Sequence, residues 1–178
     1  MKSMDKEVKK FLRSNEKYKV FKYKNKNKSP VLQFFQLSDV FALLRYVLFL
    51  FLKVFPIPPI YTWIYRLCGV KIGKNVFIGA DVIIDPFYPR LIDIGDNCTL
   101  GWDVRILTHE GYIKHFRIGR VKIGNNVVIG AFSTIRCGVA IGNNVIVAIG
   151  SVVHKDIPNN KVVGGVPIHE IKKLKKLF

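Results

Sequence analysis

The sequence predicts an all-β protein, folded as a parallel β-helix of about four coils. Aliphatic residues recur at every sixth position between residues 72 and 153, and only two insertions interrupt this step. Glycine often follows the aliphatic residue, and Asn or Asp stands in the turn of segments such as IGKNV, IGDNC and IGNNV. Both features suit tight corners with positive φ. Three such steps make one triangular coil, and coils bury their interior only by stacking.

The twelve aliphatic positions correspond to four coils. They are residues 72, 78, 84, 94, 100, 106, 123, 129, 135, 141, 147 and 153.

The chain begins with a basic N-terminal arm, residues 1–30. Residues 1–28 hold eleven Lys and Arg against three acids, so they supply +8 of the formal net charge of +17. We expect the arm to be either a solvated tail or a contact with anionic lipid headgroups. Nucleic acid is not an expected partner, because the charge lies at the chain ends and not on a platform studded with aromatic residues.

An apolar helical segment follows at residues 31–67. Its stretch VFALLRYVLFLFLKVF at 40–55 contains Arg45 and Lys53, and Pro56 follows it. A membrane span needs about 20 apolar residues, so we expect a helix that packs on the domain or lies against a membrane surface. No signal-peptide pattern is expected, and the widely spaced Cys68, Cys98 and Cys137 indicate a reducing, cytoplasmic setting.

The β-helix domain is predicted over residues 68–166, with its two insertions at 85–93 and 108–120. Each insertion follows the third step of a coil, after Ile84 and after Ile106. Both should therefore leave from the same corner and lie as stacked neighbours. Loops held on a rigid scaffold commonly carry the chemistry of a protein.

The last segment, residues 167–178, is predicted to form a short amphipathic helix. Its apolar residues at 171, 174 and 178 follow helical spacing. Such a helix would cover the exposed edge of the last coil.

Several segments resemble the hexapeptide-repeat acyltransferases, which have a left-handed β-helix. The resemblance rests on RLCGVKIGKNVFIGA, IDIGDNCTLGWDVRILTHE, VKIGNNVVIGAFSTI and IGSVVHKDIPNNKVVGGVPIHEIKKL, and it covers about 60% of the chain. These segments look most like the branch with the galactoside, maltose and polysaccharide O-acetyltransferases. The resemblance implies acetyl-CoA as donor, a sugar hydroxyl as acceptor, and a homotrimer. We expect a role in the synthesis of a surface polysaccharide or a lipid-linked glycan, because the basic arm and residues 40–60 favour a membrane-bound glycan over a free sugar.

The catalytic histidine of this family follows a coil at the start of an extended loop, which corresponds to His109. Imidazole has an ordinary pKa of about 6.5, which suits a general base at neutral pH. His115, in the same loop, is the reserve candidate. No metal is expected, because these two histidines have no third histidine nearby to complete a zinc site.

The resemblance also implies cofactor and acceptor contacts. The cofactor contacts fall at Ala131, Ala148, Ile149, His154, Lys155, His169 and Lys172. The acceptor contact that it implies is Asp81, where relatives use asparagine. If the two insertions stack, Asp85, Tyr88, Asp103 and Glu110 should line the acceptor site as well. The chain departs from its relatives at Ile149, where a small residue is usual, and at His154, where threonine or serine is usual.

Two other functions remain open at this point. Nothing in the residues separates a hydroxyl from an amine acceptor, so an amino-sugar N-acyltransferase is one alternative. A non-catalytic β-helix that acts as a scaffold at the membrane is the other.

Overall fold

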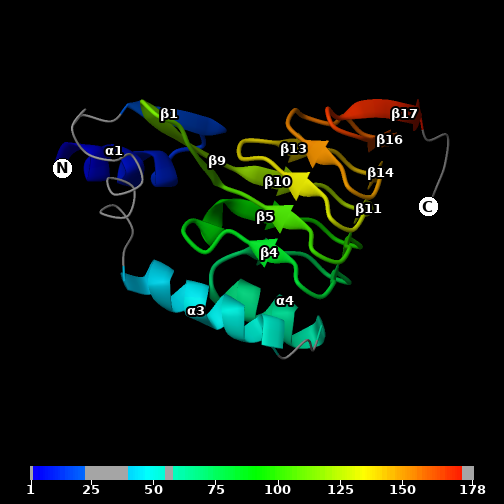
Figure 1. Ribbon diagram of the computed structural model, residues 1–178, viewed down its shortest axis with the longest axis horizontal. Helices are drawn as coiled ribbons and strands as arrows, with labels where there is room; N and C mark the ends of the chain where they lie inside the picture. Colours follow the sequence, from blue (N-terminus) through cyan, green and yellow to red (C-terminus); the bar gives the residue numbers. More distant parts are fainter. Residues whose placement is uncertain (1, 23–39, 55–57, 174–178) are drawn as a thin grey trace.

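The computed structural model describes residues 2–22, 40–54 and 58–173, and most of them form a triangular prism of stacked coils (Figure 1). The first coil contains β2 (Lys71–Ile72), β3 (Phe77–Ile78) and β4 (Ile83–Ile84). The second contains β5 (Ile92–Ile94), β6 (Thr99–Leu100) and β7 (Arg105–Ile106). The third contains β10 (Val121–Ile123), β11 (Val127–Ile129) and β12 (Thr134–Ile135), and the fourth contains β13 (Ala140–Ile141), β14 (Val145–Val147) and β15 (Val152–Val153).

The three faces of the prism are parallel sheets in strict register. Ile72, Ile94, Ile123 and Ile141 are successive partners on one face, and the equivalent aliphatic residues form a column on each of the others. Eleven of the twelve predicted aliphatic positions are at most 3% exposed, which confirms that the six-residue step marks the core.

One corner of the prism is built from asparagine ladders. Asn75, Asn97, Asn126, Asn144 and Asn160 all have positive φ, between 51° and 60°. The side-chain amide of each of the first four donates to the next at 2.9–3.1 Å. The ladder therefore supplies hydrogen-bond partners for the asparagine side chains at this corner, while their backbone stays in the left-handed region that asparagine tolerates.

The N-terminal arm is structured in its described part. Helix α1 (Lys2–Arg13) leads to β1 (Tyr18–Lys22), which pairs antiparallel with β9 (His115–Gly119), and β9 pairs with β8 (His109–Gly111). A second apolar cluster joins them; it comprises Val8, Phe11, Phe21, Leu91, Phe116 and Ile118. Residues 2–22 are therefore not a solvated tail, whereas residues 23–30 of the predicted arm lie outside the described residues.

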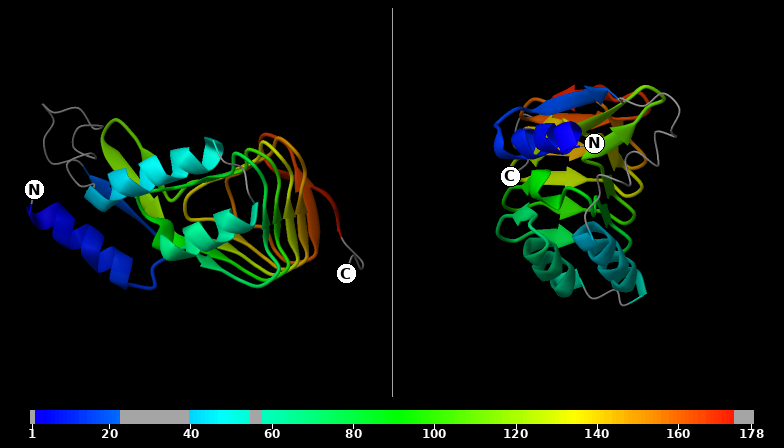
Figure 2. Two further views of the ribbon diagram at one scale, coloured as in Figure 1. Left: turned by 90° about the horizontal axis from the view of Figure 1, so that it is seen from below. Right: turned by 90° about the vertical axis from the view of Figure 1, so that its left-hand side faces the viewer.

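Two helices, α3 (Val40–Val54) and α4 (Pro58–Leu67), lie side by side beneath the first coil (Figure 2). Phe49, Tyr61 and Tyr65 join the prism core, and the Tyr65 hydroxyl donates to the Val82 carbonyl at 3.0 Å. The described part of the predicted apolar segment, residues 40–54 and 58–67, thus packs on the domain through one side, whereas residues 31–39 and 55–57 lie outside the described residues. Within the described ranges no helix is both long and apolar enough to cross a membrane.

The predicted C-terminal helix is wrong over residues 169–173. After β16 (Lys161–Gly164) the chain reverses at Pro167, and β17 (His169–Lys173) returns antiparallel to β16. The physical reason is that the last coil presents unpaired backbone groups, which an added strand satisfies and a helix would not. Residues 174–178 of the predicted helix lie outside the described residues.

Candidate active site

The two insertions leave from one corner, as the six-residue count predicts. Strand β4 pairs with β7, and the Asp85 amide donates to the Ile106 carbonyl at 3.1 Å. The first insertion carries a short 3-10 helix, η1 (Pro89–Leu91), and the second forms the β8–β9 hairpin. The stacked coils thereby bring residues 24 positions apart, Asp85 and His109, into contact.

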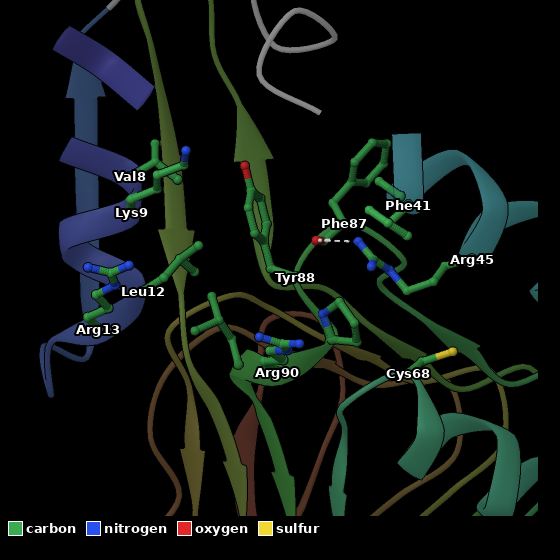
Figure 3. Close-up of a pocket in the computed structure, with 13 residues that line it drawn as sticks. Val8, Lys9, Leu12, Arg13, Phe41, Arg45, Cys68, Phe87, Tyr88 and Arg90 are labelled. Atoms are coloured by element: carbon green, nitrogen blue, oxygen red, sulfur yellow. Dashed lines mark hydrogen bonds between the residues drawn. The ribbon is translucent and has the colours of Figure 1, made fainter. Parts of the chain in front are cut away.

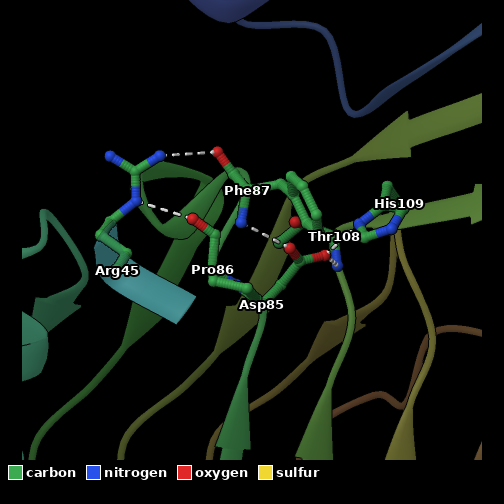
Figure 4. Close-up of polar contacts among 6 residues, drawn as sticks. All are labelled: Arg45, Asp85, Pro86, Phe87, Thr108 and His109. Atoms are coloured by element: carbon green, nitrogen blue, oxygen red, sulfur yellow. Dashed lines mark hydrogen bonds and ion pairs between the residues drawn. The ribbon is translucent and has the colours of Figure 1, made fainter. Parts of the chain in front are cut away.

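Asp85 and His109 form a buried acid–imidazole pair (Figure 4). His109 Nδ1 lies 2.5 Å from Asp85 Oδ2, and the same oxygen accepts the Thr108 amide at 2.9 Å. The Phe87 amide donates to Asp85 Oδ1 at 2.9 Å. Two backbone donors therefore fix the carboxylate, and the carboxylate in turn orients the imidazole.

The chemistry of this pair follows from burial and charge. The Asp85 side chain is 1% exposed and that of His109 is 24% exposed. Burial raises the pKa of the Asp85 carboxyl, but hydrogen bonds from His109 and Thr108 outweigh it and hold that pKa below its ordinary value. A carboxylate on Nδ1 favours the tautomer whose lone pair is on Nε2, which is the form a general base needs.

Aromatic side chains enclose His109. The rings of Phe87 and Tyr88 stand edge-on to the imidazole, with centroids 5.1 and 6.3 Å away. Arg45 of α3 braces the loop that carries them, because it donates to the carbonyls of Pro86 at 2.7 Å and Phe87 at 3.3 Å. Tyr88, one of the residues expected to contact an acceptor, therefore lies beside the His109 imidazole.

The other predicted acceptor residues are placed differently. Asp85 lies beneath His109 and has almost no exposed surface to offer a sugar, so it contacts His109 instead of the expected acceptor. Asp81 follows β3 and Asp103 follows β6, so both lie one corner of the prism away from His109. Asp81 accepts a hydrogen bond from Trp102 Nε1 at 2.7 Å, and Asp103 forms an ion pair with Arg105 at 3.0 Å. One chain does not bring them together with His109.

Glu110 belongs to a cluster that the sequence reasoning missed. Arg136 Nε lies 2.5 Å from Glu110 Oε1, and Arg136 Nη2 lies 2.6 Å from the Tyr112 hydroxyl. Burial raises the pKa of Glu110, but the hydrogen bonds from Arg136 and Tyr112 overcome it, so this pKa lies below its ordinary value. The cluster fixes the β8 end of the hairpin next to His109 instead of presenting Glu110 to an acceptor.

The predicted cofactor residues fall into separate groups. Ala131, Ala148 and Ile149 stack at the corner between the second and third strands of each coil, where the Gly150 amide donates to the Ala131 carbonyl at 2.8 Å. His154 and Lys155 are exposed after β15, and His169 and Lys172 are exposed on β17.

An exposed apolar column at the same corner was not predicted. Ile149 is 67% exposed and lies in this column, together with Trp102, Phe132 and Val166, which are 53–68% exposed. Gly130 lies against the next coil, since a Cβ there would meet the Ile149 amide at 2.5 Å. The signal in the sequence was the large residue that follows Gly101 and Ala131, where the first coil has Ala80 after Gly79.

The part of the chain that the structure describes holds no cluster of three or more His, Cys, Asp or Glu side chains that could ligate a metal ion. His115 stacks on Tyr112 with ring centroids 4.6 Å apart, and its strand is paired on both sides.

Comparison with known proteins agrees with the fold. A family model described as "Bacterial transferase hexapeptide (six repeats)" matches residues 120–155, and one described as "Hexapeptide repeat of succinyl-transferase" matches residues 69–102. YvoF of Bacillus subtilis, whose name describes it as an acetyltransferase, is 37% identical over 143 residues, or 80% of this chain and 78% of YvoF. The chain belongs to the hexapeptide-repeat acetyltransferase family.

Other members of the family extend the comparison to named sugar enzymes. Galactoside O-acetyltransferase of Escherichia coli is 34% identical over 125 residues, which cover 66% of this chain and 59% of that protein. The solved structure of a maltose O-acetyltransferase from Clostridium difficile matches with a TM-score of 0.53 and 37% identity, over 61% of this chain and 60% of that one. A Vibrio cholerae family member solved with acetyl coenzyme A matches with a TM-score of 0.53 and 27% identity, over 61% and 62% of the two chains.

These matches confirm the predicted family, the left-handed parallel β-helix and the acyltransferase class. The chain spans about 60% of the length of those solved structures.

Proposed function

We propose that this chain transfers an acetyl group from acetyl-CoA to a hydroxyl of a sugar, with His109 as general base. The observation that carries the proposal is the buried Asp85 carboxylate 2.5 Å from His109 Nδ1, at the corner where both insertions emerge. A β-helix that serves only as a scaffold does not require a buried carboxylate that orients a partly exposed imidazole.

The pair accounts for the movement of the proton. His109 Nε2 takes the hydroxyl proton as the acceptor oxygen bonds to the acyl carbon, and Asp85 stabilises the imidazolium that results. The imidazolium then gives the proton to the sulfur as the thioester bond breaks. Acetyl-CoA, when bound, supplies the acyl group as a thioester, and no covalent enzyme intermediate is needed.

The corner column suits the donor. Trp102, Phe132 and Ile149 offer apolar surface to a pantetheine arm, and Gly130 allows close approach of neighbouring backbone. Lys155 and Lys172 are exposed cations of the kind that pair with phosphates. We assign the cofactor contacts to these residues together with Ala131, Ala148, His154 and His169.

The proposed assembly is a homotrimer with each active site between neighbouring prisms. Within one chain, Asp81 and Asp103 lie at a different corner of the prism from His109, and this separation supports the assembly. A closed ring would bring that corner of one prism to the His109 corner of the next, where these acids would meet the acceptor.

The proposed setting is the cytoplasmic face of an anionic membrane, where a lipid-linked glycan or a surface polysaccharide precursor is modified. Helix α3 supports it, because Leu43, Leu44, Val47 and Phe51 are 57–65% exposed although they are large and apolar. Residues 40–80 contain five Lys or Arg and no Asp or Glu, which complements anionic headgroups. Apolar surface beside positive charge is the pattern of an interfacial helix.

The function is tested with His109→Ala, assayed for CoA release with a panel of hexoses, amino sugars and glycosides. We expect a loss of about 10²–10⁴-fold in kcat, because a general base contributes about that much, while acetyl-CoA binding by calorimetry stays unchanged.

The matched control is His115→Ala, a histidine in the same hairpin that stacks on Tyr112 instead of contacting Asp85. It should keep wild-type turnover. Full turnover by the His109 variant would refute the role of the base, and transfer only to amino sugars would replace the hydroxyl acceptor with an amine.

A further inference from the structure

A cavity of about 600 Å³ opens beside the active site, between α1, α3 and the loop of the first insertion (Figure 3). Val8, Leu12 and Arg13 contribute from α1, and Phe41 and Arg45 contribute from α3. Lys9 of α1 and Ala42 of α3 also line the cavity. The rest of the wall is Cys68 and the first insertion, with Phe87, Tyr88, Pro89, Arg90 and Leu91. A volume of this size is in the range of small-molecule sites.

The cavity is strongly cationic. Lys9, Arg13, Arg45 and Arg90 line it, and none of its thirteen lining residues is acidic. Arg45 gives its hydrogen bonds to main-chain carbonyls, and within the described residues none of the four cations has a carboxylate partner. Four cations gathered without a carboxylate favour an anionic ligand, and arginine suits phosphate because it donates two parallel hydrogen bonds.

Two side chains of the cavity wall also contact His109, although His109 does not itself line the cavity. Phe87 and Tyr88 line it, and their rings are the ones that stand edge-on to His109. A ligand held against these two rings is therefore one aromatic ring away from the imidazole. The faces of aromatic rings suit the apolar face of a sugar ring.

The α1 wall of the cavity is held in place. Arg120 donates to the carbonyls of Ser14 at 2.5 Å and Glu16 at 3.1 Å, and Phe11 packs in the cluster with Phe21 and Phe116. Phe21 and Phe116 are stacked 4.8 Å apart on the paired strands β1 and β9. The described part of the N-terminal arm thereby forms one wall of the cavity, and its positive charge lies beside the loop of the first insertion.

We propose that this cavity binds a phosphate or diphosphate group that the acceptor sugar carries, with Arg13 and Arg90 on the anion and the sugar ring against Tyr88. This substrate class rests on the proposed sugar acceptor. The same chemistry occurs in a nucleoside-diphosphate sugar and in a polyprenyl-diphosphate sugar in a membrane.

The test measures binding without any acyl donor, by titration calorimetry of the full chain with pyrophosphate and with a uridine-diphosphate hexose. We expect the wild type and His109→Ala to bind alike, and Arg13→Gln/Arg90→Gln to bind about tenfold more weakly or worse, because two charge-assisted contacts are lost. Lys10→Gln is the matched control, since Lys10 lies on α1 but does not line the cavity, and it should bind like the wild type.

Sedimentation with vesicles that carry a polyprenyl-diphosphate hexose, compared with the same vesicles without it, distinguishes the two sources of the diphosphate. Weaker binding by Arg13→Gln/Arg90→Gln than by the wild type, either in calorimetry or to the vesicles, supports the proposal. Unchanged binding by that variant in both arms, or no binding by the wild type to either probe, overturns it. The two proposals can fail separately, because His109→Ala tests acetyl transfer whereas Arg13→Gln/Arg90→Gln tests binding of the diphosphate probes without an acyl donor.

Discussion

Asp85 is a buried charge that the fold maintains at the cost of desolvation, and three hydrogen bonds offset that cost. Two of them come from the amides of Phe87 and Thr108, and the third is shared with His109. Because these contacts hold the pKa of Asp85 below its ordinary value, the carboxylate stays anionic throughout the range in which a histidine titrates.

Asp85→Asn should therefore change the pH dependence of acetyl transfer as well as its rate. An anion on Nδ1 favours the protonated imidazole, so a neutral amide should move the acidic limb of the kcat/KM profile to lower pH. The maximal kcat should fall about 10²-fold, since the imidazolium formed during transfer loses its counter-ion. The measurement is the pH–rate profile between about pH 5 and 9.

A control for Asp85→Asn is Asp103→Asn, which removes an acid that pairs with Arg105 and lies one corner away. If Asp103→Asn leaves the acidic limb in place and Asp85→Asn moves it, the shift comes from the contact with His109. An unmoved limb in Asp85→Asn would mean that Asp85 only supports the fold.

The residues of the site were predictable to different degrees. His109 follows from its place at the mouth of an insertion together with the family resemblance, and the shared corner follows from counting. The partner role of Asp85 did not follow, because an acid in a turn looks the same whether it faces a sugar or a histidine. Arg136 was missed because its pairing with Glu110 depends on which coil lies above the hairpin.

At the scale of elements, the asparagine corner is where the repeat is most demanding. Asn126 has a φ of 56° and takes part in the ladder with Asn97 and Asn144. Asn126→Gly keeps the backbone conformation and loses the ladder, so the free energy of unfolding should fall by about 1 kcal/mol. Asn126→Ala loses both and should cost about 1–2 kcal/mol more.

The two variants of Asn126 are compared by chemical denaturation followed by tryptophan fluorescence. Lys122→Ala, an exposed change on the face of the same coil, serves as control and should stay near the wild type. Equal losses for Asn126→Gly and Asn126→Ala would show that the ladder alone, and not the positive φ, makes asparagine necessary.

The elements at the two ends of the prism were harder to predict than its coils. Each coil repeats a pattern that the sequence states many times, whereas each end is formed once. The spacing of residues 171, 174 and 178 suited a helix, but the unpaired edge of β16 recruits His169–Lys173 as a strand. An edge is a property of the assembled sheet, so a local pattern does not reveal it.

At the scale of the whole molecule, the two ends of the coil stack differ in character. The C-terminal end is closed by β16 and β17, whereas α3 and α4 close the other end (Figure 1). Both helices carry large apolar side chains that are exposed. The active-site loops and the cationic cavity lie next to α3, since Arg45 of that helix braces Phe87. A membrane surface at α3 would thus lie close to the site where an acceptor is modified.

The membrane proposal predicts that Leu43→Glu/Val47→Glu abolishes binding to anionic vesicles. The wild type should float with vesicles that contain anionic lipid, less so at high salt, because exposed charges are screened. Each buried apolar side chain contributes about 1.5–3 kcal/mol, so losing two and adding two negative charges should weaken binding by more than about tenfold.

Ile113→Glu/Val20→Glu is the control, because it also replaces two exposed aliphatic residues with acids but lies on the β8–β9 hairpin and on β1. It should float like the wild type. Sedimentation velocity on the same samples identifies the other occupant that an apolar face can have, a second copy of the chain. If Leu43→Glu/Val47→Glu lowers the oligomeric state and leaves flotation intact, α3 is a subunit interface and the membrane proposal fails.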